Sequence, residues 1–422
     1  MDRYLSNKII FPLIFLFSLT VFLAHTLFTK TAVFSDGRFY YSITRSLIKD
    51  KDIKFSNEFE NLGVTPTYTH SGYVWNKYPP GAPFFWMPLF FITDGFLYLI
   101  NSVGTLGTWG WLTLDTLGYG IAYQISVAIS SILLGVLGLY LVYQVLKDHF
   151  SEKVSLLTTI MLFITTNLLF YIAVEPISSH AVSFFVSSLF VYYFLRHQND
   201  KYYYLILGII GGIAGLVRTQ DSLILITPIL QIPFKFRKTI KLMATGYWLL
   251  VTGFFIGFLP QIIFWKKLFN TFWYSPYLEE GFNFIKPQVL HVLFNNQNGL
   301  LTITPSIGIA FLGLIIIFLS IPKSFKSLEF RISGNKWLPN ISHYALLYFV
   351  VQLCLISSWS GFYQGGSYSI RMMVTTYPLL AFGLAQTIEL VTKKIKLNKV
   401  YIIVGAVTLL NIILIIRYLI SF

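Results

Sequence analysis

Long apolar runs alternate with short polar and basic segments along almost the whole chain. A helix that spans a membrane needs about 20 apolar residues, and runs near this length recur from residue 9 to residue 420. They predict spans at 9–29, 119–146, 154–173, 178–195, 203–218, 219–234, 242–265, 301–321, 341–358, 371–391 and 399–420. The pattern therefore predicts an all-α polytopic membrane protein with about 11 transmembrane helices.

Two apolar segments allow more than one interpretation. Residues 202–234 are long for one straight helix and short for two, with Arg218-Thr219-Gln220-Asp221 in the middle. Residues 84–101 are broken by Asp94-Gly95 and could form an interfacial helix or a re-entrant segment. We expect two short helices in the first case and an interfacial helix in the second, because a single span at 202–234 or a full crossing at 84–101 would move later basic clusters outside.

The basic residues predict the orientation of the chain. With a cytoplasmic N-terminus, the inner segments hold 18 basic residues and the short outer segments hold 6, as the positive-inside rule requires. The inner set is Arg3, Lys8, Lys147, Lys153, Arg196, Lys201, Lys235, Arg237, Lys238, Lys241, Lys323, Lys326, Arg331, Lys336, Lys393, Lys394, Lys396 and Lys399. Residues 1–422 then form one membrane domain. Its long first extracytoplasmic loop (30–118) carries interfacial helices, and a smaller outer loop follows at 266–300.

Composition excludes a soluble protein. Hydrophobic residues make up 55% of the chain and charged residues 11%, whereas soluble domains carry about 25% charged residues. The net charge of +14 does not indicate nucleic-acid binding, because the Lys and Arg residues lie in short clusters between spans. The single cysteine, Cys354, excludes a disulfide framework and a Cys-based metal site.

Eleven of the 17 acidic residues fall in the predicted outer segments, so we place any chemistry there. Asp36, in Phe34-Ser35-Asp36-Gly37, follows the first span and could be a general base or an ordinary helix-capping Asp. Glu175, in Val174-Glu175-Pro176, lies in a very short turn, with His180 one helical turn further on. It could act in catalysis or simply face water at a helix end. With His180 it could bind a divalent cation, although three ligands are not identifiable, so the metal is unknown.

Three cations on the same side are candidates for binding a phosphate. Lys77 begins the rigid segment Lys77-Tyr78-Pro79-Pro80-Gly81, which could equally be a lead-in to the interfacial helix. Arg218 and Arg371 stand at helix ends, where guanidinium groups suit bidentate phosphate capture. Both could instead snorkel to the interface, and Asp221 could pair with Arg218. Asn298 lies in a polar cluster, Asn295-Asn296-Gln297-Asn298-Gly299, that could hydrogen-bond a sugar or could be an ordinary loop.

Several of these pieces, in order, resemble the GT-C superfamily of membrane glycosyltransferases, closest to bacterial relatives of protein O-mannosyltransferases and lipid A aminoarabinose transferases. The resembling pieces are Asp36 after the first span, Tyr78 to Gly81, Glu175 to His180, Gly215 to Arg218, Asn298 to Pro305, and Trp359 to Arg371 with Gly365-Gly366-Ser367 between them. They cover about residues 9–385. One departure is Gly37, where many relatives have a second acidic residue.

The resemblance implies a bacterial inner membrane, a polyprenyl-phosphate sugar donor, an acceptor glycan, lipid or protein, and inversion at the anomeric carbon. On this chain it implies Asp36 as the base and Lys77, Arg218 and Arg371 around the donor phosphate. Glu175 would assist the acceptor or a metal. We place Tyr78, His180, Asn298 and Trp359 in the substrate cavity.

Two other classes remain open from the sequence. A transporter or flippase for lipid-linked sugars would need similar groups, but no internal repeat is evident and most ionisable residues lie in loops, which favours an enzyme. A polymerase or ligase acting on lipid-linked glycans usually has a larger late outer loop than 266–300.

Overall fold

The computed structural model describes residues 7–104, 108–109, 112–236, 239–274, 276–320 and 338–421. Of the basic residues predicted to lie inside, Arg3, Arg237, Lys238, Lys323, Lys326, Arg331 and Lys336 are outside this part of the chain.

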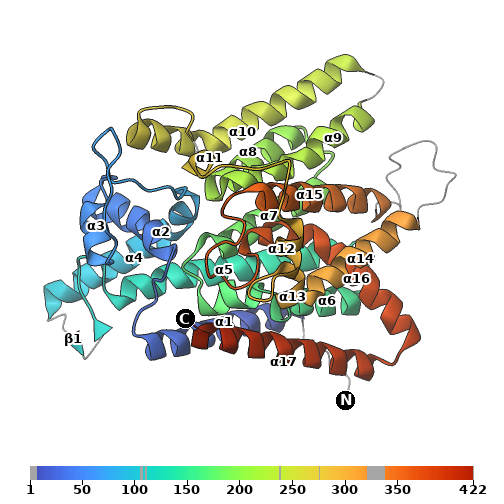
Figure 1. The fold of residues 1–422 in the computed structure, drawn as a ribbon, viewed down its shortest axis with the longest axis horizontal. Helices are drawn as coiled ribbons and strands as arrows, with labels where there is room; N and C mark the ends of the chain where they lie inside the picture. The colour runs from blue at the N-terminus through green and yellow to red at the C-terminus, as the bar shows by residue number, and fades with distance from the viewer. Residues whose placement is uncertain are drawn as a thin grey trace.

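The described residues are mostly helical, and the spanning helices run side by side (Figure 1). The α-helices are α1 (Asn7–Thr29), α2 (Gly37–Arg45), α3 (Ser56–Asn61), α4 (Gly81–Val103), α5 (Ile121–Leu146), α6 (Glu152–Ile164), α7 (Ser179–Arg196), α8 (Tyr203–Val217), α9 (Ile226–Lys235), α10 (Ile240–Phe269), α11 (Pro276–Glu280), α12 (Val289–Phe294), α13 (Leu300–Ile303), α14 (Pro305–Leu319), α15 (Leu338–Ser358), α16 (Tyr377–Lys394) and α17 (Leu397–Ser421). Two short π-helices are η1 (Ser46–Asp50) and η2 (Phe170–Val174), and two short 3₁₀ helices are η3 (Thr219–Leu225) and η4 (Arg371–Thr376). A two-stranded hairpin, β1 (Thr108–Trp109) with β2 (Leu112–Thr113), completes the list.

The protein is an all-α polytopic membrane protein, as the apolar pattern predicts. Seven helices in the described part of the chain are long and apolar enough to cross a membrane, and α8 and α14 are shorter apolar helices. Four predicted spans are divided: 154–173 becomes α6 and η2, 219–234 becomes η3 and α9, 301–321 becomes α13 and α14, and 371–391 becomes η4 and α16. The figure of about 11 spans therefore stays a prediction.

The two ends of the bundle differ. The end of α9, the start of α10 and the turn from α16 to α17 lie to the right in Figure 1, with the end of α14 and the start of α15, while α2 and α3 lie at the left. Segments predicted to be inside thus gather at one end, and the first loop covers the other. Which end faces the cytoplasm stays a prediction.

Asp94-Gly95 interrupts the apolar pattern but not the helix, because α4 runs without interruption from Gly81 to Val103. The Asp94 carboxylate accepts bonds from Lys49 Nζ (2.6 Å) and the Tyr123 hydroxyl (2.6 Å). Since its charge is compensated in this way, Asp94 does not force the helix to end. The length and composition of α4 would allow it to cross a membrane, and its expected place at the interface stays a prediction.

Residues 203–235 form two helical segments, as expected. Helix α8 ends at Val217, the chain is extended at Arg218, and η3 and α9 follow. Glycines pack α8 directly onto α10: a Cβ on Gly253 would lie 2.1 Å from the Leu205 carbonyl oxygen, and one on Gly257 would lie 2.2 Å from that of Ile209. Such backbone contact is the usual way for membrane helices to associate closely.

The first loop is folded onto the end of α10. A small apolar cluster joins the loop residues Ile43, Ile53, Phe55, Phe59 and Val74 to Phe264 and Leu268 of α10. The buried Arg45 guanidinium lies 2.6 Å from Glu58, which is itself fully buried. These contacts place the start of α2 and the segment before α4 over the bundle.

Candidate active site

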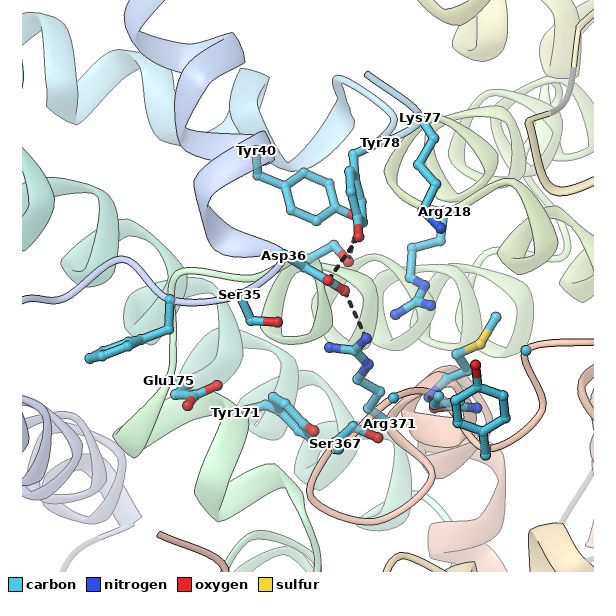
Figure 2. Close-up of a pocket in the computed structure, with 18 of the residues that line it drawn as sticks. Ser35, Asp36, Tyr40, Lys77, Tyr78, Tyr171, Glu175, Arg218, Ser367 and Arg371 are labelled. Carbon is cyan, nitrogen blue, oxygen red and sulfur yellow. Dashed lines mark hydrogen bonds and ion pairs between the residues drawn. The ribbon is translucent and has the colours of Figure 1, made fainter. Parts of the chain in front are cut away.

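A cavity of about 940 Å³ opens where the first loop meets the helix ends. Its walls come from segments far apart in the sequence: the start of α2, the segment before α4, the turn after η2, the end of α8, α11, and the 359–371 segment. In Figure 2, Asp36 and Arg371 face each other at its centre, with Tyr78 above them, Arg218 to the right and Glu175 at the lower left. Seven of the nine predicted site residues line it: Asp36, Lys77, Tyr78, Glu175, Arg218, Trp359 and Arg371.

Asp36 occupies the N-cap position of α2, but its side chain makes no capping bond. Its Oδ2 instead lies 2.8 Å from an Arg371 guanidinium nitrogen, and its Oδ1 accepts a 2.7 Å bond from the Tyr78 hydroxyl. Each carboxylate oxygen has two lone pairs, so one lone pair on each remains for another partner. The capping interpretation of Asp36 is therefore wrong, and its carboxylate belongs to the cavity.

Gly37 is needed for the close approach of α2 to the Glu175 turn. A Cβ at this position would lie 2.4 Å from the Ile177 carbonyl oxygen. A second acidic side chain beside Asp36 would therefore displace backbone in this chain. The second carboxylate of the cavity comes from Glu175 on the opposite segment.

Glu175 is mostly buried and makes no side-chain hydrogen bond or ion pair with the described residues. Burial raises the pKa of its carboxyl to about 7, against opposing attraction from Arg371 and with a smaller repulsion from Asp36. Near neutral pH this group can thus lose or gain a proton, which is a property of groups that take part in proton transfer.

Arg218 is held by His180 and not by a carboxylate. One guanidinium nitrogen lies 2.7 Å from His180 Nδ1, and because guanidinium only donates, this nitrogen of the ring accepts. The His180 ring packs against the Tyr171 ring, with ring centroids 4.5 Å apart. It is buried behind Arg218 and does not line the cavity. The expected pairing of Asp221 with Arg218 is not found, since Asp221 accepts a short bond from Ser183.

Lys77 is tied to the second loop by Glu280. Its Nζ lies 2.6 Å from Glu280 Oε1, and Glu280 Oε2 accepts a 2.8 Å bond from the indole nitrogen of Trp359. One carboxylate therefore joins three segments around the mouth of the cavity. The sequence analysis missed Glu280, because two adjacent Glu residues in a loop look like a solvated pair.

Three further residues of the cavity lining, Arg38, Tyr171 and Tyr277, were not predicted from the sequence. Arg38 is two residues from Asp36 and could have been found from that spacing. Tyr277 and Tyr171 gave no signal among 27 tyrosines. Asn298 lines a neighbouring cavity and not this one; its Nδ2 donates to the Tyr363 carbonyl at 2.6 Å.

In the described part of the chain, no group of three His, Cys, Asp or Glu residues is placed to hold a metal ion. The two carboxylates Asp36 and Glu175 lie around the guanidinium of Arg371 instead.

Comparison with known proteins supports the fold. Residues 117–264 match the family model described as dolichyl-phosphate-mannose-protein mannosyltransferase. The crystal structure of ArnT from Cupriavidus metallidurans bound to undecaprenyl phosphate superposes with a TM-score of 0.52 at 13% identity, over 90% of this chain. The chain spans 59% of the length of that protein. A comparison with curated protein sequences finds no significant match.

The resemblance to the GT-C superfamily is thereby confirmed, by the match of one segment to a mannosyltransferase family and by the fold of the chain.

Proposed function

We propose that this protein is a glycosyltransferase that moves a monosaccharide from a polyprenyl-phosphate sugar to an acceptor hydroxyl on a glycan, lipid or protein. The reaction takes place on the outer face of the membrane and inverts the anomeric carbon. Asp36 is the base, and the cations of the cavity hold the donor phosphate.

The observation that carries this proposal is that two cations without a carboxylate partner line the same cavity as the Asp36 carboxylate. Four cations line the cavity: Arg38, Lys77, Arg218 and Arg371. Lys77 pairs with Glu280 and Arg371 with Asp36. Within the described residues, neither Arg38 nor Arg218 forms an ion pair with a carboxylate. Two cations are thus available to an anion at a place where Asp36 can reach the same ligand.

The geometry suits a single displacement. The acceptor oxygen attacks the anomeric carbon, its proton passes to a free lone pair of Asp36, and the bond from that carbon to the phosphate oxygen breaks. The polyprenyl phosphate leaves with one more negative charge than it had in the donor. Positioned cations stabilise charge that develops in this way, and Arg218 and Arg371 offer it N–H donors.

Arg371 can serve both groups at once. A guanidinium has five N–H donors, and the ion pair with Asp36 Oδ2 uses one nitrogen. The other donors can bind phosphate while Asp36 stays in place. Tyr78 fixes the other carboxylate oxygen and is itself stacked on Phe39, with ring centroids 4.9 Å apart.

The donor class is also supported by the related fold. The similar ArnT structure contains undecaprenyl phosphate, and the family model that matches residues 117–264 describes transfer from a dolichyl-phosphate sugar. Both involve a polyprenyl phosphate, which is the ligand that the unpaired cations favour here.

The test of the catalytic role is Asp36→Asn. We expect transfer to fall by about 10²–10⁴-fold, the usual contribution of a general base, because an amide cannot accept the proton. Glycan profiles of a deletion strain complemented with wild type or variant provide the measurement. The residue missing from the deletion strain identifies the sugar and its attachment point. A normal profile with Asp36→Asn would remove Asp36 as the base.

The test of the donor site is Arg371→Ala. We expect weaker binding of undecaprenyl phosphate to purified protein in nanodiscs, by about tenfold or more, since a charged hydrogen bond contributes about 1.5–3 kcal/mol. Lys286→Ala is the matched control, because Lys286 is exposed on the same side and outside the cavity. Equal affinity in the two variants would remove Arg371 from the donor site.

A flippase for lipid-linked sugars is distinguished by an assay on purified wild-type protein. A transferase forms a glycosylated acceptor from a polyprenyl-phosphate sugar in detergent, whereas a flippase forms no such product.

A further inference from the structure

A second cavity, of about 530 Å³, lies against the first. This size is within the range of about 300–1,000 Å³ that is usual for small-ligand pockets. Both cavities are lined by Tyr363, Gly365, Gly366, Ser367 and Tyr418. The 363–367 segment is therefore the wall between them. On its far side the second cavity is closed by residues 291–298 and by the end of α17.

Side-chain amides are the main polar groups of this second cavity. Asn295 and Asn298 build its wall: Asn295 Oδ1 accepts from the Gln297 amide nitrogen (2.8 Å), and Asn298 Nδ2 donates to the Tyr363 carbonyl (2.6 Å). The side chains of Asn296 and Gln297 are exposed and make no hydrogen bond with the described residues. Each offers donors and acceptors together, which matches a sugar hydroxyl, since a hydroxyl also donates and accepts.

Aromatic rings accompany the amides. Tyr363 is 55% exposed, and Tyr368 and Tyr418 complete the aromatic part of the lining. Tyr418 bonds to the Gly366 carbonyl, and the Tyr368 hydroxyl bonds to Asn411 Oδ1 at 2.7 Å. Tyr418 and Tyr368 are therefore held in place, and the exposed ring of Tyr363 presents flat apolar surface against which the C–H face of a sugar ring can pack.

Charge separates the two cavities. The first has four cations and three carboxylates in its lining, whereas the described lining of the second has no Asp or Glu and one Arg, Arg417, at the end of α17. A lining of amides and tyrosines with so little charge suits a neutral polyhydroxylated ligand better than a phosphate.

The wall between the two cavities carries no side chain at Gly365 and Gly366. Gln364 and Gly365 are in the left-handed region, with φ of 55° and 52°. A Cβ on Gly365 would meet no atom within 4 Å. No side chain from this position therefore separates a ligand in the second cavity from the first.

We propose that the second cavity is a carbohydrate-binding subsite, in which Asn296, Gln297 and Tyr363 hold a neutral sugar ring of the acceptor beside the donor site. The binding of the sugar follows from the cavity alone. Its role as the acceptor rests on the proposed function.

The test is saturation-transfer NMR on the full-length protein in detergent, with the methyl glycosides of glucose, galactose, mannose and N-acetylglucosamine as probes. We expect at least one glycoside to bind the wild type. In the double variant Asn296→Ala/Gln297→Ala we expect its signal to fall by about fivefold for each lost hydrogen bond, because one such bond contributes about 1 kcal/mol. Gln288→Ala is the matched control, since Gln288 is an exposed amide in the same loop outside the cavity.

The outcomes distinguish the two proposals. Absence of a signal from all four glycosides with wild type, or an unchanged signal in the double variant, would overturn the subsite. Because an unfolded variant would also lose the signal, thermal unfolding of the double variant is measured beside it, and Tyr363→Phe, which keeps the ring, should retain binding whereas Tyr363→Ala should not. If glycosides bind but undecaprenyl phosphate does not bind the wild type, the subsite stands and the donor assignment fails.

Discussion

Asp36 and Glu175 line the same pocket as Arg371, and their surroundings differ. Asp36 has an ion pair and a tyrosine hydroxyl as partners, whereas the Glu175 carboxyl has no hydrogen-bond partner in the described part of the chain. Burial accordingly raises the pKa of Glu175 to about 7. Two carboxyl groups in unlike environments can take unlike roles in one reaction.

Glu175 makes the donor site sensitive to pH. Below about pH 7 its carboxyl is protonated and neutral, and above it a negative charge appears in the cavity that is proposed to bind a phosphate. We expect undecaprenyl phosphate to bind wild type ~3–10-fold more weakly than it binds Glu175→Gln above that pH, a repulsion of the size expected at intermediate dielectric. The two proteins should converge at lower pH.

Binding isotherms of both proteins across pH 5.5–8.5 (roughly one and a half units to either side of the Glu175 pKa) provide the measurement. Glu279→Gln, an exposed change in the same protein outside the cavity, controls for loss of a carboxylate. Thermal unfolding gives a second measurement. The folded pKa lies above the usual 4.5, so wild type should lose stability relative to Glu175→Gln as pH rises through about 7. If the binding and unfolding curves of wild type and Glu175→Gln stayed parallel across this pH range, Glu175 would not titrate in the cavity.

Close helix contacts set the geometry of the site at the level of elements. Gly81 begins α4, and a Cβ there would lie 2.4 Å from the Leu216 carbonyl oxygen at the end of α8. This contact holds the segment of Lys77 and Tyr78 beside Arg218. Gly37 does the same for α2 and the Glu175 turn. The cavity thus depends on two glycines that carry no chemistry.

Gly81→Ala tests this dependence. We expect it to lower the free energy of unfolding by about 1–3 kcal/mol, the usual cost of an overpacked contact, and to weaken undecaprenyl phosphate binding because α4 moves from α8. Thermal unfolding and binding are measured together.

Gly95→Ala, on the same helix, is the matched control. A Cβ at Gly95 would meet nothing within 4 Å, so alanine should be neutral or should stabilise the helix by up to about 1 kcal/mol. If Gly81→Ala behaved like Gly95→Ala, the packing of α4 on α8 would not position the site.

The whole molecule presents its cavities at one end of the helix bundle. The first loop, the second loop and the 359–371 segment all contribute to the first cavity. The end of α9 and the described turn from α16 to α17, at the right of Figure 1, do not line it. The distribution of basic residues predicts that the end with the cavities is extracytoplasmic.

Cysteine labelling tests this orientation. In a Cys354→Ser background, Lys286→Cys should react with a membrane-impermeant maleimide in intact cells, since Lys286 is exposed at the end that holds the cavities. Asn199→Cys, an exposed position between α7 and α8, should react only after the membrane is permeabilised. The reverse pattern would place the cavities in the cytoplasm.

The sequence by itself determined the class of protein and the positions of its helices. A helix in lipid satisfies its own backbone hydrogen bonds, so an apolar run of sufficient length predicts its place without knowledge of its neighbours. Ionisable residues near the ends of such runs are costly and stand out, and seven of the nine selected residues line one cavity for this reason.

Tertiary structure alone decided the partners of those residues. Arg371 pairs with Asp36, Arg218 with His180, and Lys77 with the unexpected Glu280. Each pair joins segments that no local pattern relates, because the packing of distant helices sets which side chains share a cavity. The same packing made α4 continuous through Asp94, whose charge is compensated by Lys49 and Tyr123 from neighbouring elements.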